Sequence, residues 1–285
     1  MAGLPRAPEQ IVFSGGGLRC FWQGGFMEAL CERRRPTPDR VAGVSGGALS
    51  AVGFLAGIER RLLEEMCAAF SDQDRNHNLF DPRHLFERGG HGITSHQQLY
   101  CEVVERVIDA AAEKRVADGP QLQILVAHPP DRRWPKLTGA AMTLFYEAEL
   151  HLINAPHFEW AEKMGLTSTL VDANEAAREG RLADLVCAAA VIPPVFDPPD
   201  WDGRPVIDGG MADQAPMPSP DRGETLILLT RDYRSMPDSP RRHYVCPSEE
   251  TPADKIDFTD PDKLRRTWDQ GEADARRLLD AEEET

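Results

Sequence analysis

The sequence has few basic residues for its length. Its 285 residues include 32 Lys and Arg against 47 Asp and Glu, which gives a formal net charge of −15. Binding to nucleic acid needs clustered Lys and Arg, so we expect no nucleic-acid partner. The same shortage argues against docking on an anionic bilayer by bulk electrostatics. A local basic or apolar patch could still contact a membrane surface.

Closely spaced cysteines and long apolar runs are also absent. The six cysteines include no C-x-x-C pair, so we predict no metal site and no disulfide framework, and nothing indicates an organic cofactor. Scattered free thiols fit a reducing cytosol. The longest apolar run, 48–58, is far short of the ~20 residues of a membrane-spanning helix, and the first ten residues lack a signal-peptide core. These features predict a cytoplasmic protein.

Short apolar segments alternate with helical patterns along the chain, and 41% hydrophobic residues can fill a sizeable core. This alternation predicts an α/β fold, a three-layer α/β/α arrangement with a mainly parallel central sheet, in a single domain covering 1–285. Residues 71–96 are polar and loop-rich and suggest a lid, and 234–262 reads as irregular. The expected strands are 11–13, 41–44, 122–127, 205–207 and 225–230; the expected helices are 21–34, 48–70, 99–114, 140–152, 176–190 and 262–281.

The first candidate site is Gly43-x-Ser45-x-Gly47, between an expected strand and an expected helix. A serine in a strained strand-to-helix turn needs small neighbours, because a Cβ on either side would collide. Its hydroxyl would lie at a helix N-terminus, where the helix dipole favours developing negative charge. The simpler interpretation is an N-cap serine flanked by turn glycines.

The second candidate is the run Gly15-Gly16-Gly17, followed by Leu18 and Arg19. Consecutive glycines expose backbone N–H groups that can converge on an anion, as in an oxyanion hole for acyl transfer. Arg19 could hold the loop in shape or contact a phosphate. A nucleotide phosphate loop is the alternative, but no G-K-[ST] follows and the spacing does not match G-x-G-x-x-G.

The third candidate is Asp208-Gly209-Gly210, directly after an expected strand. A carboxylate there would lie at the sheet edge where ligands bind in α/β folds, although a D-G turn is common. A nucleophile, a row of amide donors and a base form the minimum set for acyl transfer. Because all three segments follow short strands, a parallel sheet would gather them on one edge.

In these motifs the chain resembles the patatin-like phospholipases, serine acyl hydrolases. The matching segments are S-G-G-G-L-R (14–19), G-V-S-G-G (43–47), A-A-A-V-I-P-P-V-F (188–196) and D-G-G (208–210), within about residues 10–230. The third segment departs from the family pattern, which usually has serine at Ala189 and alanine at Val191. Since these positions look like packing sites, the departure bears on substrate fit more than on chemistry.

The resemblance implies the role of each site residue. Ser45 would be the nucleophile and Asp208 its partner in a Ser-Asp dyad. Gly15, Gly16 and Gly17 would form the oxyanion hole. Arg19, Gly43, Gly47, Gly209 and Gly210 would support the loops. The implied substrates are phospholipids, lysophospholipids or neutral acyl esters, and the net charge mildly favours a neutral or soluble ester.

Three alternatives stay open. The order Ser45…Asp208…His243 also fits a triad, because His243 is the only histidine after Asp208. The other seven histidines read as surface or lid residues without metal-ligand spacing. The same dyad could transfer the acyl group to an alcohol or amine instead of water, or the protein could bind an acyl lipid without turnover.

Overall fold

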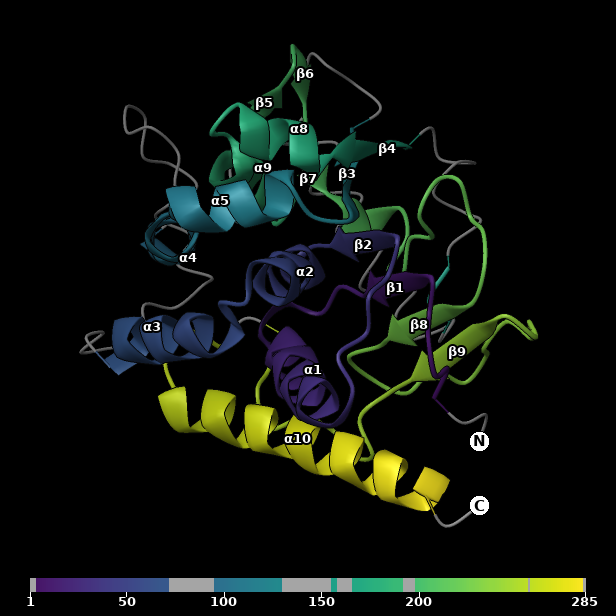
Figure 1. The fold of residues 1–285 in the computed structure, drawn as a ribbon. Helices are drawn as coiled ribbons and strands as arrows, with labels where there is room; N and C mark the ends of the chain where they lie inside the picture. The colour runs from purple at the N-terminus through teal and green to yellow at the C-terminus, as the bar shows by residue number, and fades with distance from the viewer. Residues whose placement is uncertain are drawn as a thin grey trace.

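The fold is that of a computed structural model, which describes residues 4–71, 95–129, 155–157, 166–191, 198–255 and 257–283. Its centre is a seven-stranded sheet in the order β4-β3-β2-β1-β8-β9, with β7 paired to β3 (Figure 1). Strands β1, β2, β3, β8 and β9 run parallel, whereas β4 and β7 run antiparallel to β3. The strands are β1 (Gln10–Phe13), β2 (Arg40–Val44), β3 (Gln121–His128), β4 (Thr167–Asp172), β7 (Ile207–Asp208), β8 (Thr225–Leu228) and β9 (Arg242–Val245).

Helices flank this mostly parallel sheet, as the α/β prediction requires. Helix α2 packs on β1, β2 and β3, while α8 and α9 pack on β3. Figure 1 shows the long α10 lying along α1 and reaching α3, and both contacts are among the helix pairs in the structure. The helices are α1 (Phe21–Arg33), α2 (Gly46–Ala56), α3 (Glu59–Ser71), α4 (Ser95–Val107), α5 (Ala110–Ala117), α8 (Ala173–Arg178), α9 (Leu182–Ala188) and α10 (Pro261–Glu283). The described residues also form two 3₁₀ turns, η1 (Gly17–Cys20) and η3 (Gly209–Met211), and a small hairpin of β5 (Asp200–Trp201) and β6 (Arg204–Pro205).

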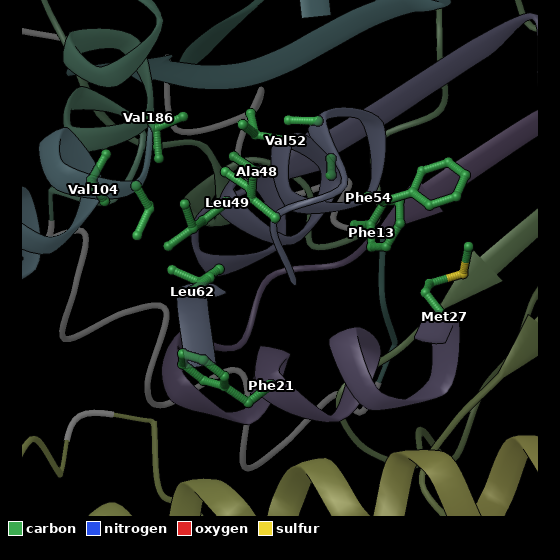
Figure 2. Close-up of a cluster of buried hydrophobic side chains, with 14 of the residues drawn as sticks. Phe13, Phe21, Met27, Ala48, Leu49, Val52, Phe54, Leu62, Val104 and Val186 are labelled. Atoms are coloured by element: carbon green, nitrogen blue, oxygen red, sulfur yellow. The ribbon is translucent and has the colours of Figure 1, made fainter. Parts of the chain in front are cut away.

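The hydrophobic core forms separate clusters on the two faces of the sheet, because successive side chains of a strand point to opposite faces. Ile11 and Phe13 of β1 point into the large cluster beneath the helices, where the Phe13 and Phe54 rings lie 6.0 Å apart (Figure 2). Val12 points to the opposite face and packs with Ile227 in a smaller cluster. Because neighbouring residues of a strand face opposite sides, β1 is buried on both faces and is a central strand.

Three expected helices are wrong in extent, because each is two helices. The expected helix 48–70 breaks where Gly57, in the left-handed conformation at φ 62°, ends α2. The expected helix 99–114 breaks at Asp109, whose side chain caps α5 by accepting from two backbone N–H groups. The expected helix 176–190 breaks near Gly180, at φ 68°. A helical apolar period continued across these breaks and hid them.

Two strands of the central sheet were not predicted. Strand β4 contains Thr-Ser-Thr-Leu-Val-Asp, with its first three residues exposed, and β9 contains Arg-His-Tyr-Val inside the segment read as irregular. Both lie at the edges of the sheet, where a strand needs no long apolar run. The expected helix 140–152 and residues 72–94 of the expected lid lie outside the described residues.

The expected terminal helix 262–281 is confirmed as α10, and it joins the main core. Its buried Leu264 and Trp268 belong to the same cluster as Phe13. Within the described part of the chain, no helix has both the length and the apolar character needed to cross a membrane.

Candidate active site

Ser45 lies in the turn between β2 and α2, in a conformation that side chains rarely adopt. Its backbone angles are φ 54° and ψ −134°, so the residue is strained. A Cβ on Gly47 would lie 2.3 Å from the Ser14 carbonyl oxygen, and one on Gly43 would lie 2.8 Å from the Ala48 Cα. Only glycine therefore fits on either side of this serine, as the sequence pattern predicted. The turn also ends at a helix N-terminus, as expected.

Asp208 is far from Ser45 in the sequence but lies next to it in the fold. Strand β7 runs antiparallel to β3 and places Asp208 beside Val126. The Asp208 N–H donates to the Val191 carbonyl at 2.7 Å, which anchors the backbone. A Cβ on Gly209 would lie 2.2 Å from the Leu125 carbonyl, so this glycine lets β7 approach β3 closely.

The two side chains are in direct contact. Ser45 Oγ donates to Asp208 Oδ2 at 2.6 Å, and the Gly210 N–H donates to Asp208 Oδ1 at 2.7 Å. Both residues are only 4% exposed. Both carboxylate oxygens therefore have partners, and the Ser45 hydroxyl is the hydrogen-bond donor in this pair.

Burial raises the pKa of Asp208 above its usual range, because the charged form loses its hydration. Three interactions oppose this effect: the hydrogen bond from Ser45, the positive charge of Lys255 and the hydrogen bond from Gly210. The net pKa is raised, which makes the carboxylate more basic than an exposed one.

The glycine loop lies against the Ser45 turn. A Cβ on Gly15 would lie 3.3 Å from the Ser45 Cβ, and one on Gly46 would lie 2.5 Å from the Gly17 carbonyl oxygen. A Cβ on Gly16 would lie 2.2 Å from Thr230 Oγ1, and Gly17 has φ +58°. The loop can approach the serine this closely because it has no side chains there.

Gly15 differs from the expected role of amide donor. Its N–H already donates to the Gln214 carbonyl at 2.9 Å, and its own carbonyl accepts from Thr230 Oγ1 at 2.7 Å. Among the described residues, no backbone carbonyl accepts a hydrogen bond from the N–H groups of Gly16 and Gly17. Gly15 thus anchors the loop through both of its own backbone groups.

Arg19 lies in η1, and its backbone N–H donates to the Gly16 carbonyl at 3.3 Å. Its positive charge, together with that of Lys255, lowers the pKa of the Cys20 thiol, although burial and Asp208 raise that pKa more strongly. Arg19 therefore belongs to the loop structurally and adds positive charge beside it.

His243 is not next to the serine. It lies in β9, paired with Leu226, and its Nε2 is 3.9 Å from Glu224 Oε2. Glu224 precedes β8, at the amino end of the parallel strands, whereas Ser45 follows the carboxyl end of β2. Strands β8 and β1 also separate β9 from β2.

The expectation for the other histidines is wrong for His128. This residue is 6% exposed, and its ring nitrogens face the Pro205 carbonyl and Thr169 Oγ1. The histidines at 77, 84, 91 and 151 lie outside the described residues, as does the side chain of His96. His157 is partly buried, with its Nδ1 2.9 Å from Asp213 Oδ1. No group of three or more His, Cys, Asp or Glu in the described ranges could hold a metal ion.

Four residues near the site were missed: Gly46, Gln214, Thr230 and Lys255. Gly46 had a signal, since the amide after an elbow nucleophile commonly serves as an oxyanion donor. The other three had none. Each meets the glycine loop through contacts between residues far apart in the sequence.

Comparisons with known proteins show the family and the fold of this chain. The model of the family described as "Patatin-like phospholipase" matches residues 11–220. The chain therefore belongs to the patatin-like phospholipases, which makes it a lipid acyl hydrolase by family. The crystal structure of VipD from Legionella pneumophila has a similar fold, with a TM-score of 0.50 at 13% identity, over 98% of this chain and 68% of that one. A comparison with curated protein sequences found no match.

Proposed function

We propose that the protein hydrolyses carboxylic esters of lipids through an acyl-enzyme on Ser45, with Asp208 as its only side-chain base. The observation that supports this most directly is the 2.6 Å hydrogen bond from Ser45 Oγ to Asp208 Oδ2. The hydroxyl proton already points at its acceptor, and no imidazole lies between the two groups.

In the first half of the reaction, Ser45 Oγ attacks the ester carbonyl and its proton passes to Asp208. The carbonyl oxygen becomes an oxyanion, and we assign its stabilisation to the amides of Gly16, Gly17 and Gly46. One such donor lowers the activation barrier by on the order of 3 kcal/mol. The tetrahedral intermediate then collapses, the alcohol leaves with the proton from Asp208, and Ser45 stays acylated.

In the second half, water attacks the acyl-enzyme and gives its proton to Asp208. The second oxyanion occupies the same amides, and Ser45 Oγ leaves with the proton from Asp208. The fatty acid and the free serine are released. Burial helps this cycle, because a carboxyl with a raised pKa is a better match to the serine proton.

Turnover of p-nitrophenyl butyrate and labelling by a fluorophosphonate probe would test the proposal. We expect Ser45→Ala and Asp208→Asn each to lower kcat/KM by roughly a thousandfold or more. The two residues act as one catalytic unit, so the loss of either one removes most of the effect of the pair. His243→Ala is the matched control and should keep most activity. Loss in His243→Ala with an intact fold would refute the dyad.

The same experiment separates the alternative activities. A fluorophosphonate should label Ser45 in a hydrolase or an acyltransferase but not in a lipid-binding protein without turnover. Added alcohol or amine acceptors then distinguish the first two, because a transferase forms a new ester or amide where a hydrolase forms the free acid.

A further inference from the structure

Lys255 lies beyond residue 220, where the family match ends, in the segment between β9 and α10. This segment is held in place by α10. The backbone N–H of the buried Ala253 donates to Oγ1 of Thr267 at 2.8 Å, and Thr267 is fully buried. The backbone that carries Lys255 is thus attached to a long helix of the core.

The backbone of Lys255 supports the glycine loop. The Leu18 N–H donates to the Lys255 carbonyl at 3.2 Å. A Cβ on Gly17 would lie 2.0 Å from that carbonyl oxygen and 3.1 Å from Lys255 Cγ. The side chain of Lys255 therefore starts in contact with the loop that faces Ser45.

The positive charge of Lys255 affects the pKa of two groups of the site. It lowers the pKa of Asp208 against the effect of burial, and it lowers the pKa of the Cys20 thiol in the same way. Cys20 is itself close to the serine turn, because its Sγ would lie 3.0 Å from a Cβ on Gly46.

Other charged or titratable groups lie near Cys20 and Asp208. Arg19 acts on Cys20 from the glycine loop. Tyr100 of α4 has a raised pKa from burial first, then from Cys187, Cys101, Cys20 and Asp208. Among these groups, Lys255 and Arg19 carry the positive charge, and Lys255 is the one whose charge reaches Asp208.

We propose that Lys255 is a positioning residue for the reaction: its carbonyl holds the glycine loop in place, and its side chain, which starts against Gly17, brings a positive charge to the Ser45–Asp208 pair. This inference rests on the proposed function, because it gives Lys255 a role through the dyad.

The test uses Lys255→Met, which removes the charge and keeps the stem, and Lys255→Arg, which keeps the charge. The matched control is Lys263→Met, whose ammonium pairs with Asp257 at 2.8 Å. The first readout is kcat/KM for p-nitrophenyl butyrate as a function of pH. We expect Lys255→Met to shift the acid limb to higher pH with its alkaline plateau within about twofold of wild type. Lys255→Arg and Lys263→Met should keep the wild-type limb.

The second readout does not depend on turnover. It is the ¹³C NMR titration of the Asp208 carboxyl in protein labelled at aspartate, assigned by the signal that Asp208→Asn removes. We expect Lys255→Met to raise the pKa of Asp208 and Lys255→Arg to leave it near the wild-type value.

The outcomes separate the two proposals. If Lys255→Met lowers kcat/KM equally at all pH values and leaves the Asp208 titration unchanged, Lys255 is only a structural support and this inference is wrong. If wild-type protein neither turns over the ester nor reacts with a fluorophosphonate, the proposed function fails. The NMR titration would still decide whether Lys255 controls the ionisation of Asp208.

Discussion

The indole Nε1 of Trp22 donates a 2.8 Å hydrogen bond to Oδ2 of Asp274, and both residues are buried. This contact joins α1, which follows the glycine loop, to α10 near the end of the chain. The family match stops at residue 220, so α10 lies outside it. The C-terminal segment therefore belongs to the same packed body as the site.

Asp274→Ala should destabilise the protein, because it leaves the buried Trp22 indole N–H without an acceptor. Oδ2 of Asp274 accepts from Trp22 Nε1 and, at 3.0 Å, from the Ser248 N–H. We expect a loss of about 1–3 kcal/mol in the free energy of unfolding, measured by urea denaturation. Asp269→Ala, at an exposed position of the same helix, should stay within about 0.5 kcal/mol of wild type. Equal effects of the two substitutions would contradict the prediction.

Two glycines of α2 should respond in opposite ways to alanine. A Cβ on Gly47 would lie 2.3 Å from the Ser14 carbonyl oxygen and 2.4 Å from that of Phe13, which are backbone atoms of the neighbouring strand and loop. Gly47→Ala should therefore displace the Ser45 turn and lower kcat/KM on the order of a hundredfold. A Cβ on Gly53 meets nothing nearer than 3.4 Å, so Gly53→Ala should keep activity and stabilise the helix by about 0.5–1 kcal/mol. Ester turnover and urea denaturation of both variants check this pair.

The activity should fall as the pH drops through the raised pKa of Asp208. The base must be ionised to accept the serine proton, and burial lifts its pKa above the usual 3.8. The acid limb of kcat/KM is thus expected above the range of an exposed aspartate, in a pH profile measured with an uncharged ester. A limb at or below 3.8, with the protein folded, would argue against Asp208 as the base.

Asp208→Asn should be at least as stable as wild type at neutral pH, although it is inactive in the proposed mechanism. A carboxyl whose pKa is raised by folding binds its proton more tightly in the folded state. Its contribution to stability is therefore full at low pH and is lost as the pH rises through the raised pKa. Asparagine keeps an acceptor for the Gly210 N–H and carries no charge.

The measurement is the difference in the free energy of unfolding between wild type and Asp208→Asn from urea curves at a series of pH values. We expect wild type to lose stability relative to the variant as the pH rises from about 4, the ordinary aspartate range, and then to level off. A variant that is less stable by the same amount at every pH would show that its hydrogen bonds, not its charge, decide the difference.

Local sequence patterns predicted most of the fold. Buried strands such as β1 and β2 are short apolar runs that end in glycine turns, and these runs identify parallel strands packed on both faces. The edge strands β4 and β9 were missed because one side of an edge strand has no strand partner, so their polar residues carry no apolar signature. The helix breaks at Gly57 and Asp109 were missed because an apolar period can continue across a one-residue cap.

For the site, the sequence by itself determined the chemical groups. These are a serine in a tight turn that has room only for glycine at the flanking positions, a run of glycines, and an acid at the end of a strand. Only the tertiary structure decided how they meet. It placed Asp208 2.6 Å from Ser45, used the Gly15 amide for Gln214, and brought Lys255 against Gly17. The reason is physical: a strained turn depends on neighbouring residues, whereas hydrogen bonds and charges at the site depend on distances between segments that are remote in the chain.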